Sequence, residues 1–201
     1  MSNTKTIMGQ ASNQYAAPTD ITDVFSTYLY DGTGAALTIT NGIDLTGEGG
    51  LVWIKSKTSL GFHALVDTER GRSKISSTNR AAAETTSGPT NDLTSFNSNG
   101  FSLGTDQQAT ANTNSQEFAS WTFRKAPKFF TCLTYTGNGV AGRTISHDLG
   151  TTVGMLVVKR TDTTGEWMVW HKDVAAINAS YALQLQSPNA AAGYSTSFNS
   201  T

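Results

Sequence analysis

The 201-residue chain is long enough for one large β domain or two small ones, and its longest strongly apolar runs (51–54 and 155–158) are too short for membrane insertion. Its 14 Lys and Arg nearly balance its 15 Asp and Glu, so the net charge is −1 and no basic field is available to bind nucleic acid. Only 14% of the residues are charged, against about 25% in most soluble domains, and such weak self-repulsion favours association with other subunits.

The N-terminal segment, residues 1–22, is predicted to be an attachment arm. Its first 20 residues are polar apart from Ile7 and Met8, so they cannot form a core of their own. Because ordering a residue costs roughly 1–2 kcal/mol of backbone entropy, a fixed position requires contacts with a partner surface or a sister subunit. The alternative is an arm folded back along the first sheet as an edge strand. The docking residues that we expect are Ile7, Met8, Tyr15, Pro18, Ile21, Val24 and Phe25.

Short runs rich in β-branched and aromatic residues, separated by Gly, Asn, Asp and Thr, predict strands along the rest of the chain. These runs are residues 24–30, 36–40, 51–56, 63–67, 100–104, 118–124, 129–136, 143–146, 155–160, 167–172 and 181–186. Helical periodicity is weak everywhere, and only residues 173–180 are expected to form a turn or two of helix. The pattern predicts an all-β protein of the sandwich or jelly-roll kind.

Strict alternation within two of these strands predicts which side chains are buried. Trp53 lies in the run LVWIK and Trp121 in the run SWTF. We expect both indoles to fill the core together with Phe123. Ser120, Thr122 and Arg124 are expected to face outward.

An internal repeat divides the chain. The motif TSFNS occurs at 94–98 and again at 196–200. With offsets of 102 to 109 residues, YDGTG (30–34) aligns with YTGNG (135–139), GLVWIKS (50–56) with GMLVVKR (154–160), and FHALVD (62–67) with WMVWHK (167–172). This spacing is too long for a solenoid unit and is typical of tandem domains. We therefore predict two lectin-like or jelly-roll sandwich repeats, at residues 23–126 and 127–201, joined near Pro127.

The second copy lacks a counterpart of residues 99–124, which include the strand 118–124. A β domain without that strand has an open sheet edge and an uncovered core. We therefore expect the second repeat to be incomplete and the chain to be the N-terminal portion of a longer polypeptide. The alternative is that a neighbouring chain supplies the missing strand.

Candidate catalytic and metal-binding residues are few. His63, His147 and His171 have no Cys or second His at metal-ligand spacing. Cys132 is the only cysteine and lies in an apolar run, which indicates an inert structural thiol. We expect neither a metal nor another cofactor.

The carboxylates of Asp67 and Glu69 could in principle form a glycosidase pair. Arg70 and Arg72 follow them closely, however, and two guanidiniums would lower both carboxyl pKa values and make either group a poor general acid. A salt-bridged turn is the better interpretation. No G-x-S-x-G motif is present, and we expect no enzymatic activity.

Trp167 and Trp170 are three residues apart in one predicted strand, so their side chains must point to opposite faces. One of them is therefore expected to lie at a subunit contact or to stack on a glycan. We favour the contact.

Several long strings together resemble a repeated domain of virion structural proteins from tailed phages, above all phages of cyanobacteria. The strings are DVFSTYLYDGTG, TITNGIDLTGEGGLVWIKSK, LVDTERG, LTSFNSNGFSLG, SWTFRKAPKFF, and YTGNG followed by RTISHDLG, and the resemblance covers residues 23–201. It implies lectin-type β-sandwiches in series, in proteins labelled tail fibre or structural protein, and it supplies no catalytic or ligand residues.

The resemblance and the composition together suggest the N-terminal part of a homotrimeric tail fibre, located in the virion and assembled in the host cytoplasm. Its expected partners are other virion proteins of the tail or capsid, and a host surface glycan bound through a further C-terminal part. The alternatives are a capsid decoration protein and a glycan-binding module for host recognition.

Overall fold

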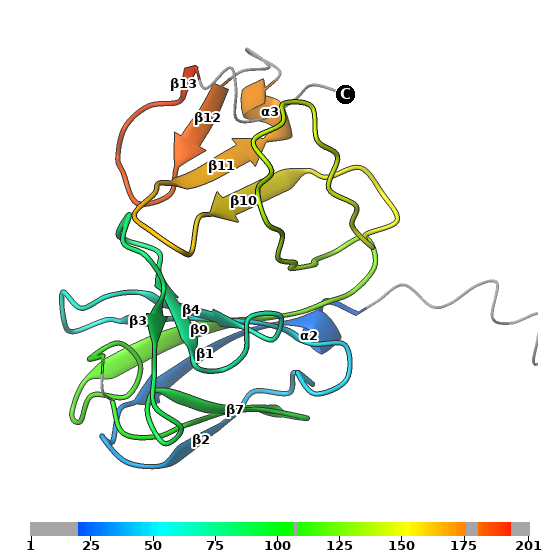
Figure 1. Cartoon of the computed structure of the whole chain (residues 1–201). Helices are drawn as coiled ribbons and strands as arrows, with labels where there is room; N and C mark the ends of the chain where they lie inside the picture. The colour runs from blue at the N-terminus through cyan, green and yellow to red at the C-terminus, as the bar shows by residue number, and fades with distance from the viewer. Residues whose placement is uncertain (1–19, 107, 176–180, 194–201) are drawn as a thin grey trace, which may run out of the picture.

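The computed structural model describes residues 20–106, 108–175 and 181–193. Almost all of its regular structure is antiparallel β-sheet, so the predicted all-β class is confirmed. We refer to residues 20–126 as the first module and to residues 127–193 as the second module (Figure 1).

The first module begins with a short helix and continues as strands. Its elements are α2 (Ile21–Val24), β1 (Phe25–Asp31), β2 (Leu37–Thr40), β3 (Gly50–Ser56), β4 (Ala64–Asp67), β5 (Lys74–Ser77), β6 (Thr85–Thr86), β7 (Leu93–Asn97), β8 (Gly100–Leu103) and β9 (Glu117–Arg124). They form a six-stranded sheet in the order β1-β9-β3-β4-β5-β6 and a three-stranded sheet in the order β2-β8-β7. The Asp20 carboxylate caps α2 by accepting a hydrogen bond from the Thr22 backbone N–H at 2.9 Å.

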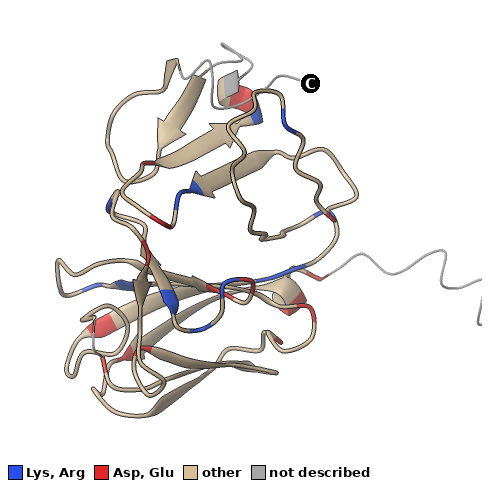
Figure 2. Cartoon of the chain, in the orientation of Figure 1, with Lys and Arg blue, Asp and Glu red and all other residues tan. Residues whose placement is uncertain are grey.

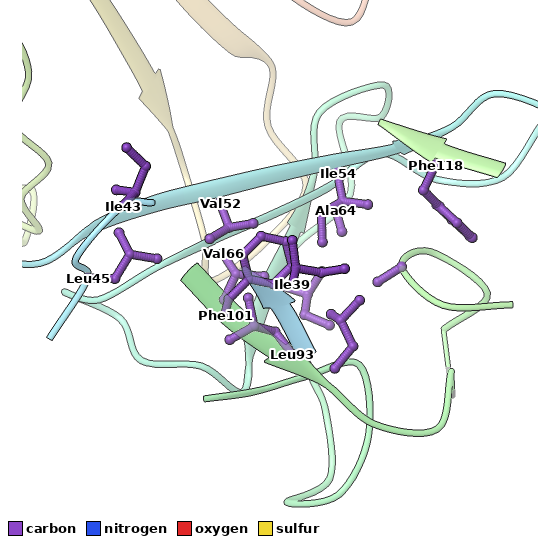
Figure 3. Close-up of a cluster of buried hydrophobic side chains, with 13 residues drawn as sticks. Ile39, Ile43, Leu45, Val52, Ile54, Ala64, Val66, Leu93, Phe101 and Phe118 are labelled. Carbon is purple, nitrogen blue, oxygen red and sulfur yellow. The ribbon is translucent and has the colours of Figure 1, made fainter. Parts of the chain in front are cut away.

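The core of the first module lies between these two sheets (Figure 3). Val52 and Ile54 of β3 point into it from the six-stranded sheet, and Ile39 and Phe101 point into it from β2 and β8. Alternation along each strand explains the arrangement, because every second side chain of β3 is buried.

The aromatic residues of β3 and β9 lie on the outer face of the six-stranded sheet. The prediction that Trp53, Trp121 and Phe123 fill the core is therefore wrong, because all three are only partly buried. Ser120 and Thr122, which were expected to face outward, are fully buried instead. The alternation was assigned correctly in both strands, but β3 and β9 each turn the opposite face to the core.

Hydrogen bonds explain why the core tolerates these two hydroxyl groups. The Ser120 hydroxyl donates to the Tyr28 carbonyl at 3.3 Å, and the Thr122 hydroxyl accepts from the Asn41 side-chain amide at 2.8 Å. A buried polar group with a partner costs little free energy. Arg124, also expected to face outward, is half-buried.

The second module contains one smaller sheet. Its elements are β10 (Met155–Lys159), β11 (Trp167–His171), α3 (Lys172–Ala175), β12 (Tyr181–Gln184) and β13 (Ala192–Gly193), and the strand order is β10-β11-β12-β13. The helix α3 falls at the start of the segment where a turn or two of helix was expected. The second copy of TSFNS lies outside the described residues.

The predicted strands at 129–136 and 143–146 are not formed. Phe130 makes an isolated bridge with Ala126, and the rest of both segments is irregular. In the first module, the strands aligned with these segments are β1 and β2, which pair with β9 and β8 respectively. A segment with strand propensity does not become a strand when no partner lies beside it.

Candidate functional site

A row of aromatic side chains crosses the outer face of the six-stranded sheet. Trp53 and Trp121 are directly opposite each other on β3 and β9, with ring centroids 5.7 Å apart. Phe123 continues the row and lies 4.9 Å from the Phe25 ring of β1. Together with Lys55, the two indoles and Phe123 line a shallow hollow of about 160 Å³. Such a surface can stack on a flat apolar group such as a sugar face or an aromatic ring.

The same outer face carries an ion-pair cluster formed by Asp67 at the end of β4, Arg70 in the turn after it and Glu84 just before β6. The Arg70 guanidinium contacts the carboxylates of Asp67 and Glu84, each at 2.6 Å, and donates to the Ser76 hydroxyl at 2.6 Å. These ionic side chains are largely buried, with 12% of Arg70, 8% of Asp67 and 13% of Glu84 exposed. The predicted salt-bridged turn is therefore present.

Glu69, the other half of the postulated carboxylate pair, points elsewhere. Its carboxylate pairs with the Lys125 ammonium at 2.9 Å, and this contact raises the Lys125 pKa. Asp67 and Glu69 therefore serve two different ion pairs, and the arrangement offers no pair of free carboxylates for general acid–base chemistry.

Trp167 joins the two modules. Its side chain is buried, and its indole N–H lies within hydrogen-bonding distance of the carbonyls of Ser77 (2.9 Å) and Arg80 (3.1 Å) in the first module. Two backbone hydrogen bonds, Glu84 to Thr161 (2.9 Å) and Gly165 to Ala81 (2.8 Å), support the same junction. One of Trp167 and Trp170 was expected at a subunit contact; Trp167 lies instead at a contact within the chain.

Trp170 lies on the other face of β11 and is partly exposed. The two tryptophans therefore do point to opposite faces, as their spacing requires. Only Trp170 keeps surface with which to touch a glycan or another subunit.

Strand β10 presents apolar side chains to solvent at the edge of the second sheet. The exposed fractions are 55% for Met155, 41% for Leu156 and 40% for Val157. Its neighbour on one side is β11, and no strand pairs with its other side in the part of the chain that the structure describes. A paired strand normally buries such residues, so this edge is a candidate interaction surface.

A buried carboxyl, Asp92, directly precedes β7. Asp92 is 1% exposed; its carboxylate accepts hydrogen bonds from the Ser87 hydroxyl at 2.5 Å and from the Gln108 backbone N–H at 3.2 Å. Burial is the largest cause of a raised Asp92 pKa, and the neighbouring Asp106 raises it further. The fold therefore shifts this group toward the protonated acid relative to a free aspartate.

This carboxyl predicts a pH dependence of stability. A raised folded-state pKa contributes stability below the unfolded pKa, and that contribution is lost as the pH rises through the folded value. An amide cannot ionise, so Asp92→Asn should become progressively more stable relative to wild type as the pH rises from about 4. Urea unfolding of both proteins across this range measures the trend.

Asp44→Asn is the matched control for this prediction. Hydrogen bonds from Thr46 lower the Asp44 pKa, so its contribution is present above the unfolded pKa and is lost as the pH falls. The two variants should therefore show opposite slopes. A pH-independent difference between wild type and Asp92→Asn would contradict the assignment.

The histidines and the cysteine do not assemble into a site. Burial, and secondarily the Lys55 charge, lower the His63 pKa. Burial is also the main reason that the Cys132 pKa is raised to about 12, so the thiol is protonated at neutral pH and unreactive. No group of three or more His, Cys, Asp or Glu side chains suited to a metal ion occurs among the described residues.

Comparison of the sequence with known protein families assigns the chain to one of them. A model described as a domain of unknown function (DUF7483) matches residues 20–201. The chain belongs to the DUF7483 family. The match begins at the Asp20 cap of α2 and spans both modules of this DUF7483 protein. No curated protein and no solved structure matches the chain.

The structure describes three of the seven predicted docking residues of this DUF7483 protein. Ile7, Met8, Tyr15 and Pro18 lie outside the described residues. Of the others, Ile21 is 54% exposed and Val24 is 1% exposed, while Phe25 is half-buried against Phe123. Among the predicted docking residues that the structure describes, Ile21 presents the largest exposed apolar surface. Within the described ranges, none of the helices has the length and apolar character needed to span a bilayer.

Proposed function

We propose that this protein is a structural component of a tailed-phage virion, forming the N-terminal part of a tail fibre or a similar appendage. Residues 1–22 would anchor it to the virion, and the β modules would follow in series as a homotrimer. The resemblance of the sequence strings to phage structural proteins supports a location in the virion. The low charge density supports assembly with other protein subunits.

One structural observation supports the proposal most strongly. The neighbours β10-β11-β12-β13 in the second module follow the same antiparallel order as β3-β4-β5-β6 in the first. Two units of one strand order, arranged one after the other along the chain, suit an extended appendage better than a single compact binding site. Figure 2 shows positive and negative residues intermingled, which agrees with packing among other proteins.

Deletion of residues 2–20 tests the anchoring role. The shortened protein should fold, with an unchanged β-sheet circular dichroism spectrum, yet be absent from purified particles. Replacing the same residues with a Gly/Ser segment of equal length controls for the loss of length. Normal incorporation of either variant would contradict the proposal.

Imaging of intact virions separates the leading location from its alternative. Labelled protein at the tail supports the appendage, whereas regular density on the capsid lattice supports a decoration protein.

Sedimentation of the purified chain tests the homotrimer.

Glycan binding is a second candidate, and the aromatic hollow favours it. Trp53 and Trp121 present indole surface beside the Lys55 ammonium, a combination that suits stacking on a sugar with hydrogen bonding at its edge. Binding of the purified chain to host cells or to a glycan array, weakened by Trp121→Ala, would support this function. Absence of binding would leave host recognition to other parts of the virion.

A further inference from the structure

In the first module, strand β3 is paired along both edges. β4 lies on one side, and β9 lies on the other in a register running from Gly50 opposite Arg124 to Ser56 opposite Phe118. The side chains of β3 that point toward the three-stranded sheet are completely buried, as the zero exposure of Val52 and Ile54 shows.

In the second module, β10 occupies the position of β3. Its order of neighbours β11, β12 and β13 matches β4, β5 and β6, and the aligned runs place Leu156 at the position of Val52. Leu156 is 41% exposed, whereas Val52 is 0% exposed. Two neighbours of β3 have no counterpart within the described residues of the second module: no strand stands beside β10 where β9 stands beside β3, and no second sheet faces it as β2-β8-β7 faces β3.

The irregular segment before β10 has the same cause. In the first module β1 pairs with β9 alone, since it is the edge strand of the order β1-β9-β3. The aligned residues 130–136 of the second module form no strand, and Leu133 and Tyr135 are 39% and 50% exposed. One absent strand therefore accounts both for the open edge of β10 and for the unpaired segment.

We propose that the open edge of β10 binds one antiparallel strand with the alternation of β9, contributed by polypeptide outside the described residues. Sheet edges commonly accept an extended peptide in this way, with backbone hydrogen bonds providing affinity and side-chain pockets providing specificity. A second copy of this chain cannot donate its own β9, because that strand is already paired with β1 and β3. This inference stands apart from the virion proposal.

The register of β3 and β9 defines the expected fit. Trp53 lies opposite Trp121, and Leu51 lies opposite Phe123. Val157 and Met155 occupy the aligned positions in β10, so two bulky apolar residues of the donor, two positions apart, should cover them. The intervening donor residues should be small and hydroxylic, like Ser120 and Thr122 of β9.

Binding of a β9 peptide to the full chain tests the inference. The probe is a fluorescent synthetic peptide with the sequence of residues 115–126, and a scrambled peptide of the same composition is its control. Fluorescence anisotropy should show at least tenfold tighter binding of the native peptide. Hydrogen exchange should show new protection at residues 155–159.

Two variants make the result specific to this edge. Val157→Lys places a charge on the edge and should weaken peptide binding at least tenfold. Val140→Lys alters a more exposed residue outside the strands (66% exposed) and should leave binding unchanged. Circular dichroism checks that both variants fold.

Three results would overturn the proposal. The first is equal binding of native and scrambled peptides. The second is protection confined to other segments. The third is self-association of the chain that Val157→Lys abolishes and the peptide does not affect, which would assign the edge to a second copy.

Discussion

Replacing Arg70 with alanine is expected to lower the free energy of unfolding by about 3–5 kcal/mol. The guanidinium is the shared counter-charge of Asp67 and Glu84, which are 8% and 13% exposed. Its removal leaves two nearly buried carboxylates, of which only Glu84 has another cation nearby, the Lys74 ammonium at 3.6 Å. Urea unfolding at pH 7 measures the loss.

Arg160→Ala is the matched control. Arg160 pairs with Asp162 at 2.6 Å, but these side chains are 62% and 70% exposed, so its removal should change the free energy of unfolding far less than the removal of Arg70. Equal losses in the two variants would show that burial does not govern the Arg70 cluster.

Replacing Phe101 with alanine should cost a similar amount, about 3–5 kcal/mol, for a different reason. The ring is 0% exposed and belongs to the cluster between the two sheets of the first module. On β8 it lies opposite Ile39 on one side and Phe96 on the other. Truncation leaves a cavity that the paired strands on both sides cannot close.

Phe62→Ala provides the comparison for this core variant. Phe62 is 38% exposed, and its main partner is the Arg80 guanidinium, 3.9 Å from the ring centroid. Its loss should cost about 1 kcal/mol or less. If Phe62→Ala destabilised the protein as much as Phe101→Ala, the position of the core between the sheets would be wrong.

Short runs of apolar, β-branched and aromatic residues bounded by turn residues predicted most strands of the first module, including β1, β3, β4 and β9. Strands β5 and β6 were missed. Their sequences, KISS and TT, are mostly polar, and they are strands because β4 and β5 respectively pair with them. β7, the LTSFN run, was recognised as a repeated motif but not as a strand.

The error at Trp53 and Trp121 has a different origin. A period of two shows which residues share a face but not which face meets the second sheet. In β9 the choice lay between a face with Phe118 and two hydroxyl groups and a face with Trp121 and Phe123. Hydrophobicity favoured the second face, but the hydrogen-bond partners of the hydroxyls lie elsewhere in the chain.

The candidate sites also depend on contacts between distant residues, which the sequence pattern does not show. The Asp67–Arg70 pair could be predicted, because the two residues are three positions apart in one turn. Glu84 could not be added from sequence, since only the pairing of β4, β5 and β6 brings it to Arg70. The spacing of Trp167 and Trp170 predicted opposite faces, but nothing in the sequence indicated the carbonyls that receive the Trp167 indole.

The position of Trp167 has a mechanical consequence. The backbone passes between the modules near Pro127, and the Trp167 indole makes a second connection to the carbonyls of Ser77 and Arg80 at the end of β5 and in the turn after it. A single linker would act as a hinge, but two separated attachments resist rotation about either one. Tension applied to the second module therefore reaches the first module through the end of β5 and the turn after it as well as through the linker.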